Sequence, residues 1–343
     1  MTRASQTEDP ADPVPPMQSV SRRSRTLAGR LVPAVFVLAV VASTARADDA
    51  MEWLTRAAQA ARKLDYAGTI VYQIGPRVES SRITHLNDGG HEYAKLVNLD
   101  GPAREVVRDQ GEVRCYYPDA KLMRVEPGTF RNVFPSLLPE QQQSLSQFYE
   151  FRVLGEDRVG GRPVQVVVFE PRDGLRYGHR FWSDVATGLL LKARVVNEHG
   201  AAVEQFAFSD LTIDPKIDRA MVEPTWQTVP RDWQVLESAS GDVVRQDTGW
   251  VVNRVPPGFA KIMEGYRKYH GRPERVAHLV FSDGLVSVSV FIEPLAAASA
   301  PSGFLQQGGL NVYSVRHDDH LITVMGETPS ATVRQIANSV THR

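Results

Sequence analysis

Turn signals recur about every ten residues between Gly68 and Asp214, and this spacing constrains the fold more than any other feature of the chain. They are Asp88-Gly89-Gly90, Asp100-Gly101, Gln110-Gly111, Gly160-Gly161, Asp173-Gly174, Thr187-Gly188 and His199-Gly200. The short runs between them favour strands, and only Pro139–Phe148 is helix-permissive. We therefore predict a meander of about ten antiparallel strands. Such a sheet is expected to curl, with an apolar hollow if closure is partial and a filled interior if it is complete.

The register of one hairpin can be predicted from its charges. In Leu175–Trp182 and Leu189–Val196 the odd positions are mostly apolar or aromatic, and basic residues stand at even positions: Arg176, Arg180, Lys192 and Arg194. A one-residue slip would bury the arginines, so odd positions must pair with odd ones across a loop at Asp184–Gly188. The result is a four-member basic strip, which is either a solvated face or a site for an anion or an acidic peptide.

The first 47 residues have the order of a secretory signal. Four arginines between Arg22 and Arg30 precede the apolar run Leu31–Ala42, and Ala45-Arg46-Ala47 follows as a cleavage site. The run has 12 residues, whereas a bilayer span needs about 20, so we expect cleavage after Ala47 and no membrane span. The mature chain is expected to be exported.

Beyond this signal peptide (1–47) we predict a large domain over 48–220, a linker over 221–247 and a small α+β domain over 248–343. Leu54, Ala57 and Leu64 share one face of an amphipathic helix that opens the large domain. The linker is punctuated by prolines and carries two tryptophans that look exposed, Trp226 and Trp233. In the small domain we expect alternating strands, a short helical segment ending near Tyr269, and a final helix after Pro329.

Composition and motifs exclude several classes of function. Lys and Arg total 39 against 40 Asp and Glu, so there is no basic excess for nucleic acid. The single cysteine, Cys115, excludes an intrachain disulfide and multi-thiolate metal sites. The sequence contains no nucleophile elbow, phosphate-binding loop or dinucleotide fingerprint, and His317-Asp318-Asp319-His320 is better explained as a hairpin turn than as metal ligands. We therefore expect no catalytic residue, no metal and no cofactor.

Many short stretches of the mature chain follow one another in a recognisable order. They include Gly68-Thr69 with Tyr72, Leu99-Asp100-Gly101 with Arg104-Glu105-Val106-Val107-Arg108, Arg176-Tyr177-Gly178, Trp182-Ser183-Asp184, Thr187-Gly188-Leu189-Leu190-Leu191-Lys192, Pro256-Pro257-Gly258-Phe259, Phe281-Ser282-Asp283-Gly284-Leu285 and Thr323-Val324-Met325-Gly326-Glu327-Thr328-Pro329. No single stretch is specific, but so many in this order are, and with them the chain resembles the RseB/MucB family of periplasmic regulators.

The resemblance implies a fold and a function without catalysis. The fold is α+β and mostly β: an unclosed antiparallel barrel with helices, like the lipoprotein carriers, joined to a smaller α+β domain. The function is negative regulation of a sigma-E-type envelope stress response in the periplasm. Such a protein binds the periplasmic domain of an anti-sigma factor, shields it from proteolysis and releases it on sensing lipid or lipopolysaccharide acyl chains. A homodimer is compatible with this interpretation.

From face and charge we select candidate residues for lipid or anti-sigma binding: Tyr72, Arg104, Arg108, Arg176, Tyr177, Arg180 and Trp182. We expect Arg176→Glu to weaken lipid binding more than it lowers thermal stability. Two other functions stay open. One is a periplasmic lipid or lipoprotein carrier, which the large domain alone would suit. The other is an exported hydrolase whose site has no recognisable motif.

Overall fold

The computed structural model describes residues 44–109, 111–127, 142–237, 244–268, 275–295 and 302–343. The predicted signal peptide lies outside these residues except for its last four, which form the first turn of helix α1 (Thr44–Lys63). Thus α1 begins four residues before Asp48, the predicted start of the large domain. The other helices are α2 (Gln142–Phe148), α3 (Ser330–Ala337) and the short 3-10 turns η1 (Pro118–Ala120) and η3 (Arg219–Met221).

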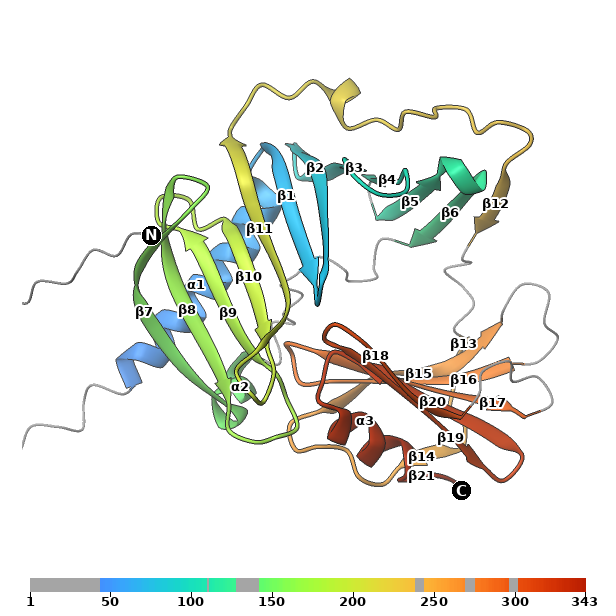
Figure 1. Cartoon of the computed structure of the whole chain (residues 1–343). Helices are drawn as coiled ribbons and strands as arrows, with labels where there is room; N and C mark the ends of the chain where they lie inside the picture. The colour runs from blue at the N-terminus through green and yellow to red at the C-terminus, as the bar shows by residue number, and fades with distance from the viewer. Residues whose placement is uncertain (1–43, 110, 128–141, 238–243, 269–274, 296–301) are drawn as a thin grey trace, which may run out of the picture. The chain divides into compact units, whose positions relative to one another are not determined.

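The described residues between 66 and 237 build one large open sheet, coloured from blue to gold in Figure 1. Its 12 strands lie in the order β12-β6-β5-β4-β3-β2-β1-β11-β10-β9-β8-β7. Their bounds are β1 (Tyr66–Ile74), β2 (Arg77–Asp88), β3 (His91–Asn98), β4 (Glu105–Asp109), β5 (Glu112–Tyr117), β6 (Leu122–Pro127), β7 (Tyr149–Val159), β8 (Arg162–Pro171), β9 (Gly178–Asp184), β10 (Leu190–Val196), β11 (Ala202–Ile213) and β12 (Gln234–Glu237). All neighbours are antiparallel except β12, which runs parallel to β6. The predicted antiparallel meander and its unclosed form are confirmed.

The β9–β10 hairpin has the predicted register. Phe181 pairs with Ala193 and His179 with Val195, so odd positions face odd ones. The strands are shorter than we predicted, because β9 begins only at Gly178. Arg176 therefore lies before the strand and outside the basic strip, and only 1% of its surface is exposed. The prediction of a four-member strip was wrong for this arginine.

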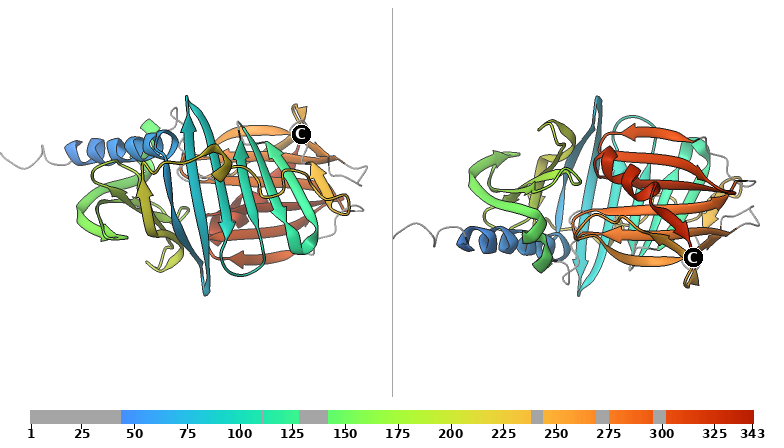
Figure 2. Two further views of the ribbon diagram at one scale, coloured as in Figure 1. Left: turned by 90° about the horizontal axis from the view of Figure 1, so that it is seen from above. Right: turned by 90° about the horizontal axis from the view of Figure 1, so that it is seen from below.

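The described residues between 244 and 342 form a second sheet and a small third one. The second has seven strands in the order β13-β15-β16-β17-β20-β19-β18, and α3 covers one of its faces (Figure 2). Its strands are β13 (Val244–Arg245), β15 (Ala260–Lys268), β16 (Arg275–Ser282), β17 (Ser287–Pro294), β18 (Gly303–Gln307), β19 (Leu310–His317) and β20 (His320–Gly326). The third pairs β14 (Trp250–Val252) with β21 (Val340–His342). Together they confirm the predicted α+β class.

One predicted element of this region was wrong. The helical segment expected to end near Tyr269 is strand β15, which pairs with β16 from Ala260 to Lys268. Gly265 is buried inside this segment, where a glycine weakens a helix, and the pairing with β16 decides the conformation. The final helix is confirmed, with Val333, Ile336 and Ala337 buried.

The two tryptophans between the large sheets are half-buried and packed against the first sheet. Trp226 stacks on Tyr116 with ring centroids 5.6 Å apart, and Trp233 lies 5.3 Å from Trp226. Both tryptophans cover the buried side chains Val107 and Met123. The expectation that they are exposed was wrong, because β12 adds to the edge strand β6 and holds them on the sheet.

Candidate functional site

A buried arginine joins the two large sheets. Arg176 Nε donates to Asp283 Oδ2 over 2.9 Å, and neither side chain has any exposed surface. The guanidinium also bonds the Asp173 carboxylate and the Pro257 carbonyl. It lies over the ring of Phe259, 4.9 Å from the centroid. A buried charge needs such partners, so Arg176 is fixed by residues from both halves of the chain.

Asp283 is held as firmly as the arginine. Its Oδ1 accepts from the backbone N–H groups of Leu285 and Val286, each at 3.0 Å. Its Oδ2 also accepts from the hydroxyl of Tyr149 at 2.9 Å. Burial raises the pKa of Tyr149 well above its usual value, and the nearby Asp283 charge adds to this, so the phenol stays protonated and donates. The turn that begins at Asp283 thus supplies the counter-ion of Arg176.

The residues on either side of Arg176 contact the same region. Tyr177 accepts a hydrogen bond from Asn311 Nδ2 at 2.8 Å. The carbonyl of Leu175 accepts one from Thr332 Oγ1 at 2.7 Å. Three consecutive residues thus connect the large sheet to β16–β17, β19 and α3. We call this set, with Asp283, the junction.

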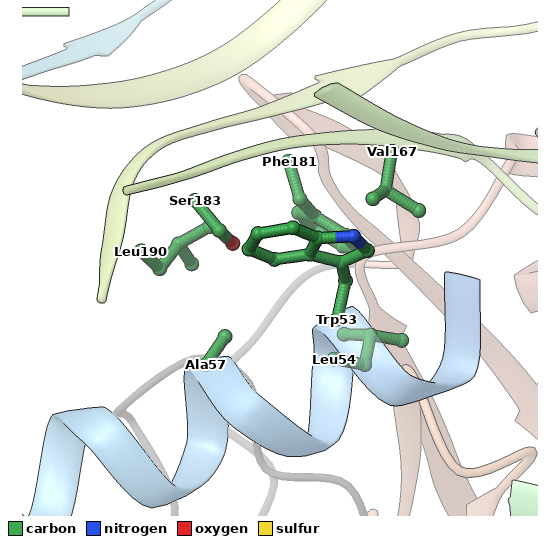
Figure 3. A pocket seen from close by; sticks show the side chains of 7 residues that line it. All are labelled: Trp53, Leu54, Ala57, Val167, Phe181, Ser183 and Leu190. Carbon is green, nitrogen blue, oxygen red and sulfur yellow. The ribbon is translucent and has the colours of Figure 1, made fainter. Parts of the chain in front are cut away.

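Under β8–β10, the space inside the curled sheet is filled by residues of helix α1. Helix α1 packs against β8–β10, and Trp53 points from it into the space between Val167, Phe181 and Leu190 (Figure 3). The remaining cavity is about 10 Å³, roughly what one water molecule needs. The guanidinium of Arg56 lies over the Trp53 ring at 4.2 Å from its centroid. An acyl chain can enter this space only if Trp53 moves.

A half-buried apolar row crosses the large sheet away from this hollow. Ile83, Leu96, Val106 and Cys115 pair successively across β2, β3, β4 and β5. Burial raises the pKa of the Cys115 thiol, which therefore stays protonated. Of the predicted arginines, Arg108 lies in β4 beside this row and contacts Glu92 at 3.6 Å, while Arg104 is exposed just before β4. The row thus has an apolar centre, with the Arg108–Glu92 pair on one side and Arg104 on the other.

The basic strip exists with a different fourth member. Arg152, Val168, Arg180 and Arg194 pair in turn across β7, β8, β9 and β10. Lys192 and Arg194 lie over the ring of Trp182, at 4.6 and 5.6 Å from its centroid. Burial, and secondarily Arg194, lower the pKa of Lys192. Arg152 thus takes the place that we had assigned to Arg176.

The predicted site residues therefore fall in separate places. Arg176 and Tyr177 belong to the junction, Arg180 and Trp182 to the basic strip, and Arg104 and Arg108 to the margin of the apolar row. Tyr72 lies in β1, where its hydroxyl donates to Glu204, and burial with this bond raises its pKa. Sequence patterns missed Trp53, Tyr149 and Asp283, because nothing local distinguishes them from core or turn residues. Among the described residues there is no cluster that could hold a metal ion.

Comparison with known proteins shows the family to which the chain belongs. Models of the MucB/RseB N-terminal domain and the MucB/RseB C-terminal domain match residues 49–226 and 244–341. The chain belongs to the MucB/RseB family. The family member MucB of Pseudomonas aeruginosa, a regulatory protein of the sigma factor AlgU, is 34% identical over 307 residues, which are 86% of this chain and 92% of MucB. The sigma-E factor regulatory protein RseB of Escherichia coli K12 is 26% identical over 282 residues, 82% of this chain and 87% of RseB.

Solved MucB structures agree over the same extent. MucB in complex with MucA(peri) superposes with a TM-score of 0.67 at 32% identity, covering 86% of this chain and 99% of that one. MucB alone gives 0.60 at 30% identity, with coverage of 86% and 98%. Both relatives are regulatory proteins of sigma factors. In the part of this chain that the structure describes, no helix is long and apolar enough to cross a bilayer.

Proposed function

We propose that the chain is a periplasmic negative regulator that binds the periplasmic domain of an anti-sigma factor and shields it from proteolysis. The supporting observation is the agreement with the MucB chain in its complex with MucA(peri), over 86% of this chain and 99% of that one. Both halves of the chain are matched, and the junction ties them together through Arg176 and Asp283. A partner that contacts both halves would then meet a fixed surface.

The test is binding of the purified chain from residue 48 onward to the periplasmic segment of MucA, by isothermal titration calorimetry. We expect a saturable complex with one site per chain. A protease added to the mixture should cut the MucA segment more slowly when the chain is present, and bovine serum albumin at equal mass is the control. No binding at high micromolar concentration, with unchanged cleavage, would contradict the proposal.

We further propose that lipid acyl chains weaken this complex by entering the space that Trp53 fills. Trp53 and Leu54 belong to the same apolar core as Phe281 and Ala277 of β16, so moving α1 disturbs residues on both sides of the junction. If lipid favours an arrangement that the anti-sigma segment does not, each weakens the other by the same factor. Arg56, whose guanidinium lies over the Trp53 ring, is the candidate to meet the anionic head group there, whereas Arg104 and Arg108 lie beside the apolar row, away from this space.

Trp53→Ala tests this step, because it enlarges the cavity under α1 without removing a charge. We expect tighter binding of a lauroyl amphiphile to the variant than to the unchanged chain, and release of the MucA segment at lower amphiphile concentration. Trp226→Ala is the matched control, since it truncates a tryptophan that packs elsewhere, on Tyr116. Equal amphiphile affinity in all three proteins would remove the space under α1 as the lipid site and leave MucA binding untouched.

A further inference from the structure

Two arginines of the basic strip lie directly opposite each other on neighbouring strands. Strands β9 and β10 are adjacent in the large sheet (Figure 1), and Arg180 of β9 pairs with Arg194 of β10. Lys192 stands two residues before Arg194, as the diagonal neighbour of Arg180. We call these three residues the cation cluster. They are half-buried, and like charges placed in this way destabilise a sheet.

The carboxylates on the same face leave the cluster with a surplus of positive charge. Glu170 pairs with Arg152 at the far end of the strip, and Glu150 lies opposite Glu170 in the edge strand β7. Asp157 accepts a hydrogen bond from the indole Nε1 of Trp182 over 3.0 Å, and its charge also acts on the lysine of the cluster. Among the described residues, no carboxylate forms an ion pair with any of the three cations. Three cations less the charge of Asp157 leave a surplus of about two positive charges.

The side chains of the cluster are held in place by neutral and aromatic groups. Arg194 Nε donates to Gln205 Oε1 over 3.0 Å, and Gln205 Nε2 donates to Gln73 Oε1 over 3.3 Å. Lys192 and Arg194 lie over the ring of Trp182. Within the part of the chain that the structure describes, no protein group accepts from the remaining N–H donors of the cluster. A ligand would therefore meet donors that are already oriented, which lowers the entropic cost of binding.

Charge and donor geometry together favour a doubly charged oxyanion. A phosphate group carries up to about two negative charges and has three oxygens that accept hydrogen bonds strongly. The guanidinium forks of Arg180 and Arg194 match such oxygens, and Lys192 adds a point charge. A carboxylate carries a single charge and would neutralise only half of the surplus. Burial, and then the charge of Arg194, lower the pKa of Lys192, and a bound anion would offset the second of these causes.

We propose that the cation cluster binds a doubly charged phosphate group on the face of the large sheet that turns away from α1. Successive residues of a strand point to opposite faces. Phe181 lies on the face toward Trp53 (Figure 3), so Arg180 and Trp182 lie on the other one. The inference goes beyond the proposed function, because this site is separate from the space that Trp53 fills. The phosphate group belongs either to free phosphate or to a lipid head group, and the experiment distinguishes these sources.

Inorganic phosphate is the first probe, and its binding is followed by the NMR signal of the Trp182 indole N–H, which Trp182→Phe assigns. The titration uses the chain from residue 48 onward at constant ionic strength, so that general screening does not change. We expect saturable binding of one phosphate per chain. Arg180→Gln and Arg194→Gln should each bind about tenfold more weakly. Arg152→Gln is the matched control, because Glu170 already neutralises that arginine, and its affinity should stay within about twofold of the unchanged chain.

Thermal unfolding separates a lost site from a lost fold. Without phosphate, Arg180→Gln should unfold at the temperature of the unchanged chain or above it, because the substitution removes a repulsion. Phosphate should raise the unfolding temperature of the unchanged chain and of Arg152→Gln, and should raise that of Arg180→Gln much less.

Vesicles then identify the source of the phosphate group. If the chain sediments with vesicles of phosphatidic acid in phosphatidylcholine, but not with phosphatidylcholine alone, and free phosphate releases it, the cluster takes a lipid head group. If it binds free phosphate and sediments with neither, the cluster takes a soluble phosphate; both outcomes support the proposal. Absence of saturable phosphate binding by the unchanged chain would overturn it, and so would equal affinity in Arg180→Gln, Arg194→Gln and the unchanged chain. Binding of the MucA segment is measured separately, so these outcomes leave the proposed function untouched.

Discussion

Arg176 and Asp283 form a fully buried ion pair between residues 107 positions apart in the sequence. Each carries further bonds, from Arg176 to Asp173 and from Tyr149 to Asp283, so neither charge is left alone. Taking two charges out of water costs several kcal/mol per ion, and good geometry is needed to offset that cost. The pair therefore adds little to the overall stability of the fold. Its main effect is to fix one arrangement of Leu175–Tyr177 against the Asp283 turn.

Removing one partner of this pair should destabilise the protein strongly. We expect Arg176→Met to lower the free energy of unfolding by about 3–5 kcal/mol, because Asp283 would remain buried without a counter-ion. The double variant Arg176→Met with Asp283→Asn should lose clearly less than the sum of the two single losses. Urea unfolding followed by tryptophan fluorescence measures all four proteins, and strict additivity would contradict the argument.

The burial of Arg176 also reverses the expectation drawn for Arg176→Glu. A glutamate there would face Asp283 and Asp173 with no cation between them. Its effect should appear first as a lower unfolding temperature. A lipid-binding role for this residue stays a prediction, and Arg180→Glu, in the partly exposed basic strip, is the variant on which lipid affinity can be read without loss of the core.

Acid should destabilise the protein through His179. Burial lowers the pKa of His179 to about 4, whereas an unfolded histidine has a pKa near 6.5, so the folded state favours the neutral ring. The stabilisation is present above about pH 6.5 and is lost as the pH falls toward about 4, by about 3 kcal/mol in total. His179→Phe should show a shallower loss over this window. The exposed His199→Gln is the control and should follow the unchanged chain; a variant His179→Phe with the original pH slope would refute the assignment.

Gly68 should tolerate no side chain, although its backbone conformation is ordinary. A Cβ atom at this position of β1 would lie 2.3 Å from the carbonyl oxygen of Asp210 in β11. One of the two strands would have to shift next to the irregularity at Thr69 and Ile70. We expect Gly68→Ala to lower the free energy of unfolding by about 2 kcal/mol. Gly90→Ala, where nothing lies within 4 Å but φ is +93°, should cost only about 1 kcal/mol; the opposite order of the two losses would contradict the close approach.

The features of the fold that could be predicted from the sequence are those that depend on residues close together in the chain. Turn residues and alternation gave the meander and the odd-with-odd register of Phe181 and Ala193, since turn chemistry and the side on which charges lie are local properties. The partner of Arg176 could not be predicted, because it comes from a turn 107 positions away. Strand β15 was mistaken for a helix for the same reason: short apolar runs take their conformation from the neighbour with which they pair.

The segment after β11 packs on the large sheet, which its pattern of prolines did not predict. Trp226 stacks on Tyr116 and covers Val107, and β12 continues from it along β6. Trp226→Ala should therefore lower the free energy of unfolding by about 2 kcal/mol, below the full cost of a buried tryptophan because the ring is only partly buried. It should also speed amide exchange in β12 and β6, whereas β19 and β20 keep their protection. If exchange in β12 is unaffected, pairing with β6 and not the tryptophan holds this segment on the sheet.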